Sequence, residues 1–202
     1  DNASLENLMK SVGKYYFSFN DNENTPLNFF SRVVQNCANL AASYNIFGFV
    51  HGVLNTDNIN VTGESFDYGP YRMMEKYNPE KIAAYFDHSG LYKFSNQVDA
   101  IFWNIQQLAS IMTLFLEEKL IIEELKRYID LYNIEVLRLF FQRLGLQPNS
   151  LDSNNQKLLK DFYEILIKSP YLYEEIYHDL RGGKERVNSQ TELKQKYKNF
   201  NL

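Results

Sequence analysis

The sequence predicts a mainly α-helical domain that carries one small β-hairpin. Apolar residues recur at helical spacing through most of the 202 positions, whereas residues 49–69 are glycine-punctuated and partly β-branched. Hydrophobic residues make up 45% of the chain, with 15 tyrosines and 15 phenylalanines. That content is enough to bury a sizeable core, so we expect one domain, with or without an appendage.

Two helices are expected in the first quarter of the chain. Residues 4–19 place apolar side chains on one helical face, and a polar loop follows at 21–24. Thr25 can cap a second helix that has Pro26 in its first turn. This helix should stop near Asn45, and Gly48 should end the connection.

The glycine-punctuated stretch predicts a short hairpin. Ile59–Thr62 and Ser65–Phe66 are its candidate strands, with Gly63 in the turn between them. Asn78 and Pro79 then favour a short helix that runs to about Phe86.

The remainder of the sequence is helical again. We expect helices from about Gln97, over 117–144 and over 155–180, with breaks at 145–154 and near Pro170. The compact part should end at Gly182–Gly183. The charged tail from Lys184 predicts a poorly packed terminal helix or disorder.

Composition excludes several classes of protein. The formal net charge of −4 gives no overall attraction to nucleic acid or to an anionic membrane. No apolar run reaches the roughly 18 residues of a membrane span, and the first residues do not resemble a signal peptide. The single cysteine, Cys37, lies on an apolar stripe and suits an inert core thiol. We therefore expect a cytoplasmic protein that binds neither membranes nor nucleic acid.

The most informative stretch runs from His51 to Gly69. His51, Leu54 and Asn58 fall on the His, Leu and Asn of the protein-kinase catalytic loop H-R-D-L-x-x-x-N, and Asp67-Tyr68-Gly69 follows where a kinase has Asp-Phe-Gly. In kinases, that Asn and Asp hold the metal that bridges the phosphates of ATP. Asn58 and Asp67 are hard oxygen donors and therefore suit Mg²⁺.

One position departs from the kinase pattern. Val53 stands where a kinase has its catalytic Asp, and a valine cannot accept a proton. The nearest carboxylate is Asp57, beside the candidate metal ligand Asn58. Either Asp57 acts as the base from a different place, or phosphoryl transfer to a hydroxyl is not the chemistry.

The wider sequence resembles the selenoprotein O family, also called YdiU. The resemblance is carried by residues 49–58 (FVHGVLNTDN), 67–70 (DYGP), 87–97 (DHSGLYKFSNQ) and 103–109 (WNIQQLA), and it extends from about Leu5 to Gly182. It implies a kinase-like fold that transfers AMP from ATP to Ser, Thr or Tyr hydroxyls of proteins. By this resemblance Asp57 is the proton acceptor, and Asn58 and Asp67 bind Mg²⁺ or Mn²⁺ together with ATP.

The family also has an N-terminal lobe with a Gly-containing nucleotide loop and a phosphate-contacting Lys. The first 48 residues here contain three basic groups, Lys10, Lys14 and Arg32, and no Gly-rich phosphate loop. We therefore expect residues 1–183 to form an isolated kinase-like C-lobe, 184–202 to form a polar tail and the N-lobe to be absent. Such a chain should transfer AMP weakly or not at all, because half of the ATP clamp is missing.

Other interpretations stay open. The chain could be a non-catalytic binding module or a truncated family remnant that binds a separate N-lobe or self-associates through an exposed apolar face. Asp67 could be a turn residue, and Asp57 could only tune charge. His51 is expected to order the loop, as are Asp87 and His88, with a smaller chance that the latter two contact substrate. Trp103 is expected in the core.

Overall fold

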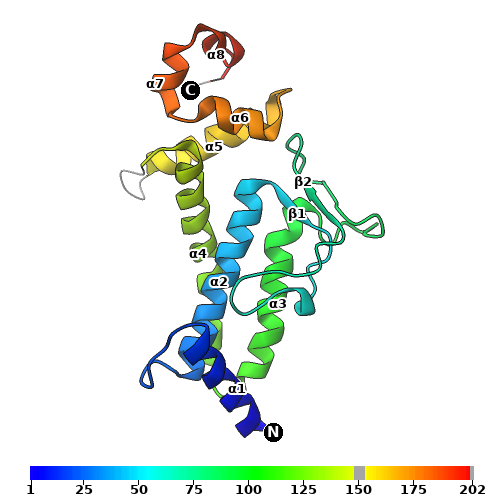
Figure 1. Ribbon diagram of the computed structural model, residues 1–202, viewed down its shortest axis with the longest axis vertical. Coiled ribbons are helices and arrows are strands. Elements are labelled where there is room, and N and C mark those ends of the chain that lie inside the picture. The colour runs from blue at the N-terminus through cyan, green and yellow to red at the C-terminus, as the bar shows by residue number, and fades with distance from the viewer. Residues whose placement is uncertain (148–152, 201–202) are drawn as a thin grey trace.

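The computed structural model describes residues 1–147 and 153–200, and it is mainly helical as expected. None of the helices in these ranges is both long and apolar enough to cross a membrane. Figure 1 shows α2, α3 and α4 side by side along the long axis, with α1 at the N-terminal end and α5–α8 at the opposite end. The helices are α1 (Asn2–Tyr15), α2 (Pro26–Phe47), α3 (Gln97–Met112), α4 (Glu118–Leu144), α5 (Ser153–Lys168), α6 (Tyr173–Leu180), α7 (Gly183–Ser189) and α8 (Thr191–Lys196).

Helix α2 begins and ends as its sequence predicts. The Thr25 side chain accepts a hydrogen bond from Asn28 N at 3.2 Å, and Pro26 occupies the first turn. Gly48 ends the helix in the left-handed conformation (φ 64°), which glycine adopts without steric cost. The helix runs two residues past the predicted end at Asn45, whereas α1 stops at Tyr15, before the predicted Phe19.

The sheet forms beside the predicted hairpin. Strands β1 (Phe49–His51) and β2 (Tyr71–Met73) pair antiparallel, with Val50 opposite Arg72. The predicted strands within residues 59–66 meet in one isolated bridge, between Ile59 and Ser65. Gly63 lies in the turn as expected (φ 82°). The hairpin prediction was therefore right about the turn and wrong about the strands, which lie on either side of it.

The helix predicted from Asn78 to about Phe86 is not formed, and turns and bends replace it. Pro79 O and Lys81 O accept hydrogen bonds from the backbone of Ser95 and Phe94, at 3.0 and 2.9 Å. These long-range bonds use carbonyls that a helix would need for its own first turn. They also tie this segment to the start of α3.

The core divides into two hydrophobic clusters, which share α2 and α4. We call them the N-terminal core, built on α1–α3, and the C-terminal core, built on α5–α8. Helix α4 contributes Tyr128 to the first and Phe140 to the second. The strand and loop after α2 also contribute to both, because Val50 is buried in the C-terminal core and Leu54 in the N-terminal core.

The segment after Gly183 packs against the rest of the protein, which contradicts the expected poor packing. Val187, Leu193 and Tyr197 are buried members of the C-terminal core. The Tyr197 hydroxyl donates to Asp179 Oδ2 at 2.9 Å, and Lys196 forms an ion pair with the same carboxylate. Apolar burial and these polar contacts together hold the charged segment against the C-terminal core.

Candidate functional site

His51 holds the loop that follows β1. Its ring is fully buried, with Nε2 2.8 Å from Phe66 O and Nδ1 accepting from Val53 N at 3.1 Å. A carbonyl can only accept, so Nε2 carries the proton and the ring is neutral. Burial lowers the pKa of His51 below its ordinary value, although Phe66 O and the Asp67 carboxylate oppose this shift. The predicted loop-ordering role is confirmed, since both ring nitrogens are engaged.

Two buried amides on α3 satisfy the backbone of the same loop. Gln97 accepts from His51 N at 2.7 Å and donates to Phe49 O at 2.9 Å. Asn104 donates to Leu54 O at 2.8 Å. Sequence reasoning gave neither residue this role. The available signal was their seven-residue spacing on the apolar stripe of α3, since polar residues on a buried face need partners.

Asn58 and the segment before Asp67 are brought together by the backbone. Phe66 N donates to Asn58 O at 2.9 Å, which places Asp67 one residue beyond the contact. The Asn58 side chain is buried, and its Nδ2 donates to Val53 O at 3.0 Å. This bond fixes the amide, and its Oδ1 makes no hydrogen bond with any described residue. One acceptor oxygen is thus held in place without a protein donor.

Asp67 is exposed and has an unusual backbone conformation. Its φ of 54° lies in the left-handed region, which is uncommon for residues other than glycine. The residue before it is fixed through both its N–H and its carbonyl, by Asn58 and His51. Such a conformation costs free energy and persists only where the surroundings impose it. The two bonds to Phe66 hold the chain on the N-terminal side of this residue.

Asn58 and Asp67 suit a cation that takes only one or two ligands from the protein and the rest of its coordination shell from water or substrate. Both present hard oxygen atoms, the ligand type preferred by Mg²⁺. Across residues 1–147 and 153–200, no three His, Cys, Asp or Glu side chains gather into a metal-binding group. Mg²⁺ is commonly held by one or two protein oxygens, with water and substrate phosphates completing the octahedron. The residues present therefore fit such an ion together with a nucleotide.

Asp57 lies on the short 3₁₀ helix η1 (Thr56–Asn58), exposed to solvent. The hydroxyl of Tyr92 donates to Oδ1 of Asn55, which lies two residues before Asp57. Burial raises the pKa of Tyr92, and the Asp87 and Asp57 carboxylates raise it further. The Asp57 carboxylate therefore lies within electrostatic reach of the Tyr92 hydroxyl.

Asp87 orders the loop that carries Tyr92. Its two carboxylate oxygens accept from Leu91 N at 2.8 Å and Tyr92 N at 2.9 Å. Asp87 is buried, whereas His88 is exposed. The expected loop-ordering role is confirmed for Asp87, and its loop is tied through Tyr92 to the loop of Asp57.

Gly52 brings the two candidate loops into direct contact. Its N–H donates to Pro70 O at 2.7 Å. A Cβ at this position would lie 2.3 Å from the same oxygen, closer than any real contact. Only glycine fits here, so the His51 loop and the Asp67–Pro70 loop touch through backbone.

Large apolar side chains lie exposed on the segment that follows Ser65 and on the loop that lines a hollow with Gly69 and Pro70. We call the exposed set the aromatic rim: Phe66, Tyr68, Tyr71, Met73, Tyr85 and Phe86. Tyr85, for example, is 86% exposed. A single exposed hydrophobic residue is normal on a protein surface, but a group of them gathered in one place needs an explanation. Trp103, expected in the core, is 53% exposed on α3, so that prediction was wrong.

Comparison with known proteins gives a consistent result. The family profile described as "Protein adenylyltransferase SelO" matches residues 1–201. A protein named "Protein nucleotidyltransferase YdiU" from Trichodesmium erythraeum is 39% identical over 153 residues, which cover 76% of this chain and 32% of that protein. Its namesake from Synechocystis sp. is 36% identical over 166 residues, covering 80% of this chain and 35% of the relative.

The chain thus spans about a third of the length of these curated relatives. The profile matches nearly every residue, and the motifs quoted above lie inside it. Both results identify the same group of proteins. This chain therefore belongs to the SelO family of protein adenylyltransferases, which includes the nucleotidyltransferases named YdiU.

Proposed function

We propose that this chain is a kinase-like C-lobe that holds the metal and part of the ATP in a protein adenylyltransferase. The proposal is carried by the fixed side-chain amide of Asn58, whose Oδ1 has no donor among the described residues, and by the bond from Phe66 N to the main-chain carbonyl of Asn58, which brings the loop of Asp67 beside it. We assign these two side chains to Mg²⁺, or Mn²⁺, bound with ATP. When bound, the metal supplies positive charge that stabilises the transferring phosphate.

Asp57 is the proposed base. The carboxylate is exposed and makes no hydrogen bond or ion pair with a described residue, so it is available to a hydroxyl. It would take the proton of a Ser, Thr or Tyr hydroxyl while the oxygen forms a bond to the α-phosphorus of ATP and pyrophosphate leaves. Val53 cannot do this, and both ring nitrogens of His51 are engaged.

Complete activity requires groups that these residues do not provide. The described residues near Asn58 include no Gly-rich loop, so we propose weak or no transfer by this chain alone. The aromatic rim suits a covering lobe, either from another segment or from a separate chain, or a second copy. The single buried thiol of Cys37 is in keeping with a reducing, cytoplasmic setting.

A non-catalytic binding module is the second candidate, and the aromatic rim is the observation that favours it. Such a module would use the exposed rings to bind a partner and would not need ATP. The two candidates therefore differ in whether Asn58 and Asp67 bind nucleotide.

Calorimetric titration of ATP with Mg²⁺ into the chain tests the proposal. We expect measurable binding that Asp67→Ala weakens at least tenfold, because one of two charged or polar metal ligands is lost. Asp21→Ala, which removes an exposed carboxylate from the loop between α1 and α2, is the matched control and should leave binding unchanged. Absence of binding, or equal binding by both variants, would overturn the nucleotide site and favour the module.

A further inference from the structure

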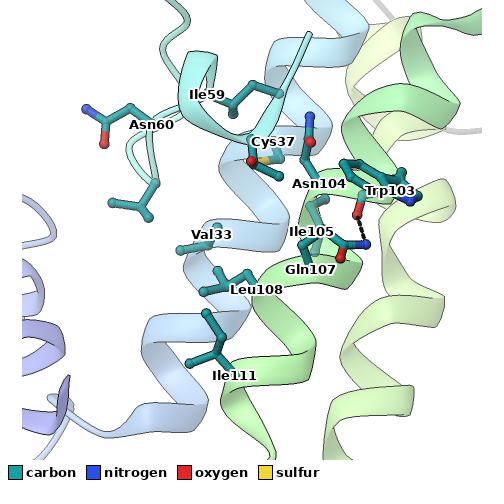
Figure 2. Close-up of a pocket in the computed structure, with 12 residues that line it drawn as sticks. Val33, Cys37, Ile59, Asn60, Trp103, Asn104, Ile105, Gln107, Leu108 and Ile111 are labelled. Atoms are coloured by element: carbon teal, nitrogen blue, oxygen red, sulfur yellow. Dashed lines mark hydrogen bonds between the residues drawn. The ribbon is translucent and has the colours of Figure 1, made fainter. Parts of the chain in front are cut away.

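A pocket lies directly beside the reacting loop. It is an open hollow with a volume of about 450 Å³, bounded by α2, α3 and residues of the 56–61 loop. Figure 2 shows Val33 and Cys37 of α2 facing Ile105, Leu108 and Ile111 of α3, with Ile59 and Asn60 at the loop end. The lining is therefore mostly apolar, with Thr56 and Asn60 in the loop and Asn104 and Gln107 on α3 as its polar members. Its volume lies within the range of about 300–1,000 Å³ usual for ligand sites.

We propose that this pocket binds a large apolar side chain of the acceptor protein, close in sequence to the hydroxyl that receives AMP. The inference rests on the proposed function and deepens it, because it assigns part of the acceptor specificity to residues away from the metal. The occupant is a segment of the acceptor with a Leu, Met, Phe or similar residue next to its Ser, Thr or Tyr.

The position of the pocket is the first argument. Thr56 and Ile59 line it, and these residues stand directly before and after Asp57 and Asn58. Consecutive Cα atoms are about 3.8 Å apart, so the wall of the pocket begins one residue from the proposed base. A bound segment whose hydroxyl faces Asp57 would place its next few side chains within reach of the pocket.

The state of the lining residues is the second argument. Trp103 and Ile111 are 53% and 46% exposed on the α3 side of the pocket, although both are strongly apolar. Burying such side chains against an apolar partner is favourable, so their exposure beside the pocket favours an apolar occupant.

The pocket holds no reactive group among the described residues that line it. Cys37 is its nucleophilic side chain, but it is 3% exposed and burial raises the pKa of its thiol to about 12. A thiol in that state is neutral and unreactive at neutral pH. The pocket is therefore a binding wall and not a second reaction centre.

Trp103 makes the pocket directly observable, because it is the single tryptophan of the chain. The probes are synthetic peptides that contain one Ser in a Gly-rich background, with one Leu placed one to four positions on either side. Matched peptides carry Asn in place of Leu. No ATP is needed, so binding is read independently of AMP transfer.

We expect Leu peptides at the favoured spacing to change Trp103 emission saturably and Asn peptides to bind at least tenfold more weakly. Ile111→Arg, which places a cation in the pocket, should reduce Leu-peptide affinity at least tenfold, and Gln107→Arg at its mouth should act similarly. Ile129→Arg, on α4 and 49% exposed, is the matched control and should change nothing. Thermal melting of each variant identifies any loss of folding.

Equal responses to Leu and Asn peptides, or full binding by both pocket variants, would overturn the inference. A concentration-dependent Trp103 shift without peptide, abolished by Ile111→Arg, would show that a second copy occupies the pocket and would also overturn it. If peptides bind as expected while ATP does not bind, the pocket stands and the proposed nucleotide site fails. If ATP binds but the Leu and Asn peptides bind equally, the proposed nucleotide site stands and the pocket inference fails.

Discussion

Replacing His51 with Phe should destabilise the protein through two specific hydrogen bonds. The substitution keeps an aromatic ring beside Tyr44, Phe49 and Tyr68, whose centroids lie 5.5–6.2 Å from that of His51. It removes the partners of Phe66 O and Val53 N. An unsatisfied group costs about 1–3 kcal/mol when fully buried, and both of these bonds are partly buried, so the free energy of unfolding should fall by about 2 kcal/mol or more at pH 7.5.

The same substitution should change the pH dependence of stability. Burial holds the pKa of His51 below its ordinary value of 6.5, so the unfolded chain binds a proton before the folded protein does. This contribution to stability is complete above pH 6.5 and is lost as the pH falls toward the folded pKa. The slope reaches at most about 1.4 kcal/mol per pH unit. His51→Phe lacks this titrating group, so the difference in the free energy of unfolding between wild type and His51→Phe should become smaller as the pH falls.

Urea denaturation followed by circular dichroism at pH 7.5, 6.5 and 5.5 measures both effects. His88→Phe is the control, because His88 is exposed and surface substitutions usually change stability by less than about 0.5 kcal/mol. A gap between wild type and His51→Phe that stays constant across this range would refute the buried, neutral histidine. A loss below about 1 kcal/mol at pH 7.5 would refute the role of its two hydrogen bonds.

Three further predictions concern single contacts. Gly52→Ala should cost about 1–3 kcal/mol in urea denaturation, because its Cβ would meet Pro70 O at 2.3 Å; no loss would mean that the two loops separate easily. Tyr92→Phe should cost about 0.5–1.5 kcal/mol in the same assay, since its hydroxyl donates to Asn55; an unchanged midpoint would show that this bond is not needed. Cys37 should resist Ellman's reagent in native buffer and react fully in urea, because burial raises the pKa of its thiol to about 12, and rapid native labelling would contradict that burial.

The helices could be predicted because their signals are local. Thr25, Pro26 and Gly48 each act on the helix end where they stand, and they bound α2 almost to the residue. A candidate site could also be proposed, since His51, Asn58 and Asp67 keep a recognisable spacing. Whether Asn58 and Asp67 bind metal, and whether Asp57 is the base, stays a prediction.

The failures share a non-local cause. Strand β1 pairs with residues about twenty positions further along the chain, and no local sequence pattern predicts that register. The segment from Asn78 is held by backbone bonds to Phe94 and Ser95, which override its weak helical pattern. The buried amides of Gln97 and Asn104 bind carbonyls of a loop that is distant in sequence, so the sequence alone does not show their role.

The anchoring of the His51 loop in two cores has a consequence for folding. Val50 belongs to the C-terminal core and Leu54 to the N-terminal core, with His51, Gly52 and Val53 between them. These three residues can keep their geometry only while both clusters are intact and correctly placed. Partial opening of either cluster should therefore release the loop before global unfolding, and a ligand that binds the loop should slow amide exchange in both halves of the protein.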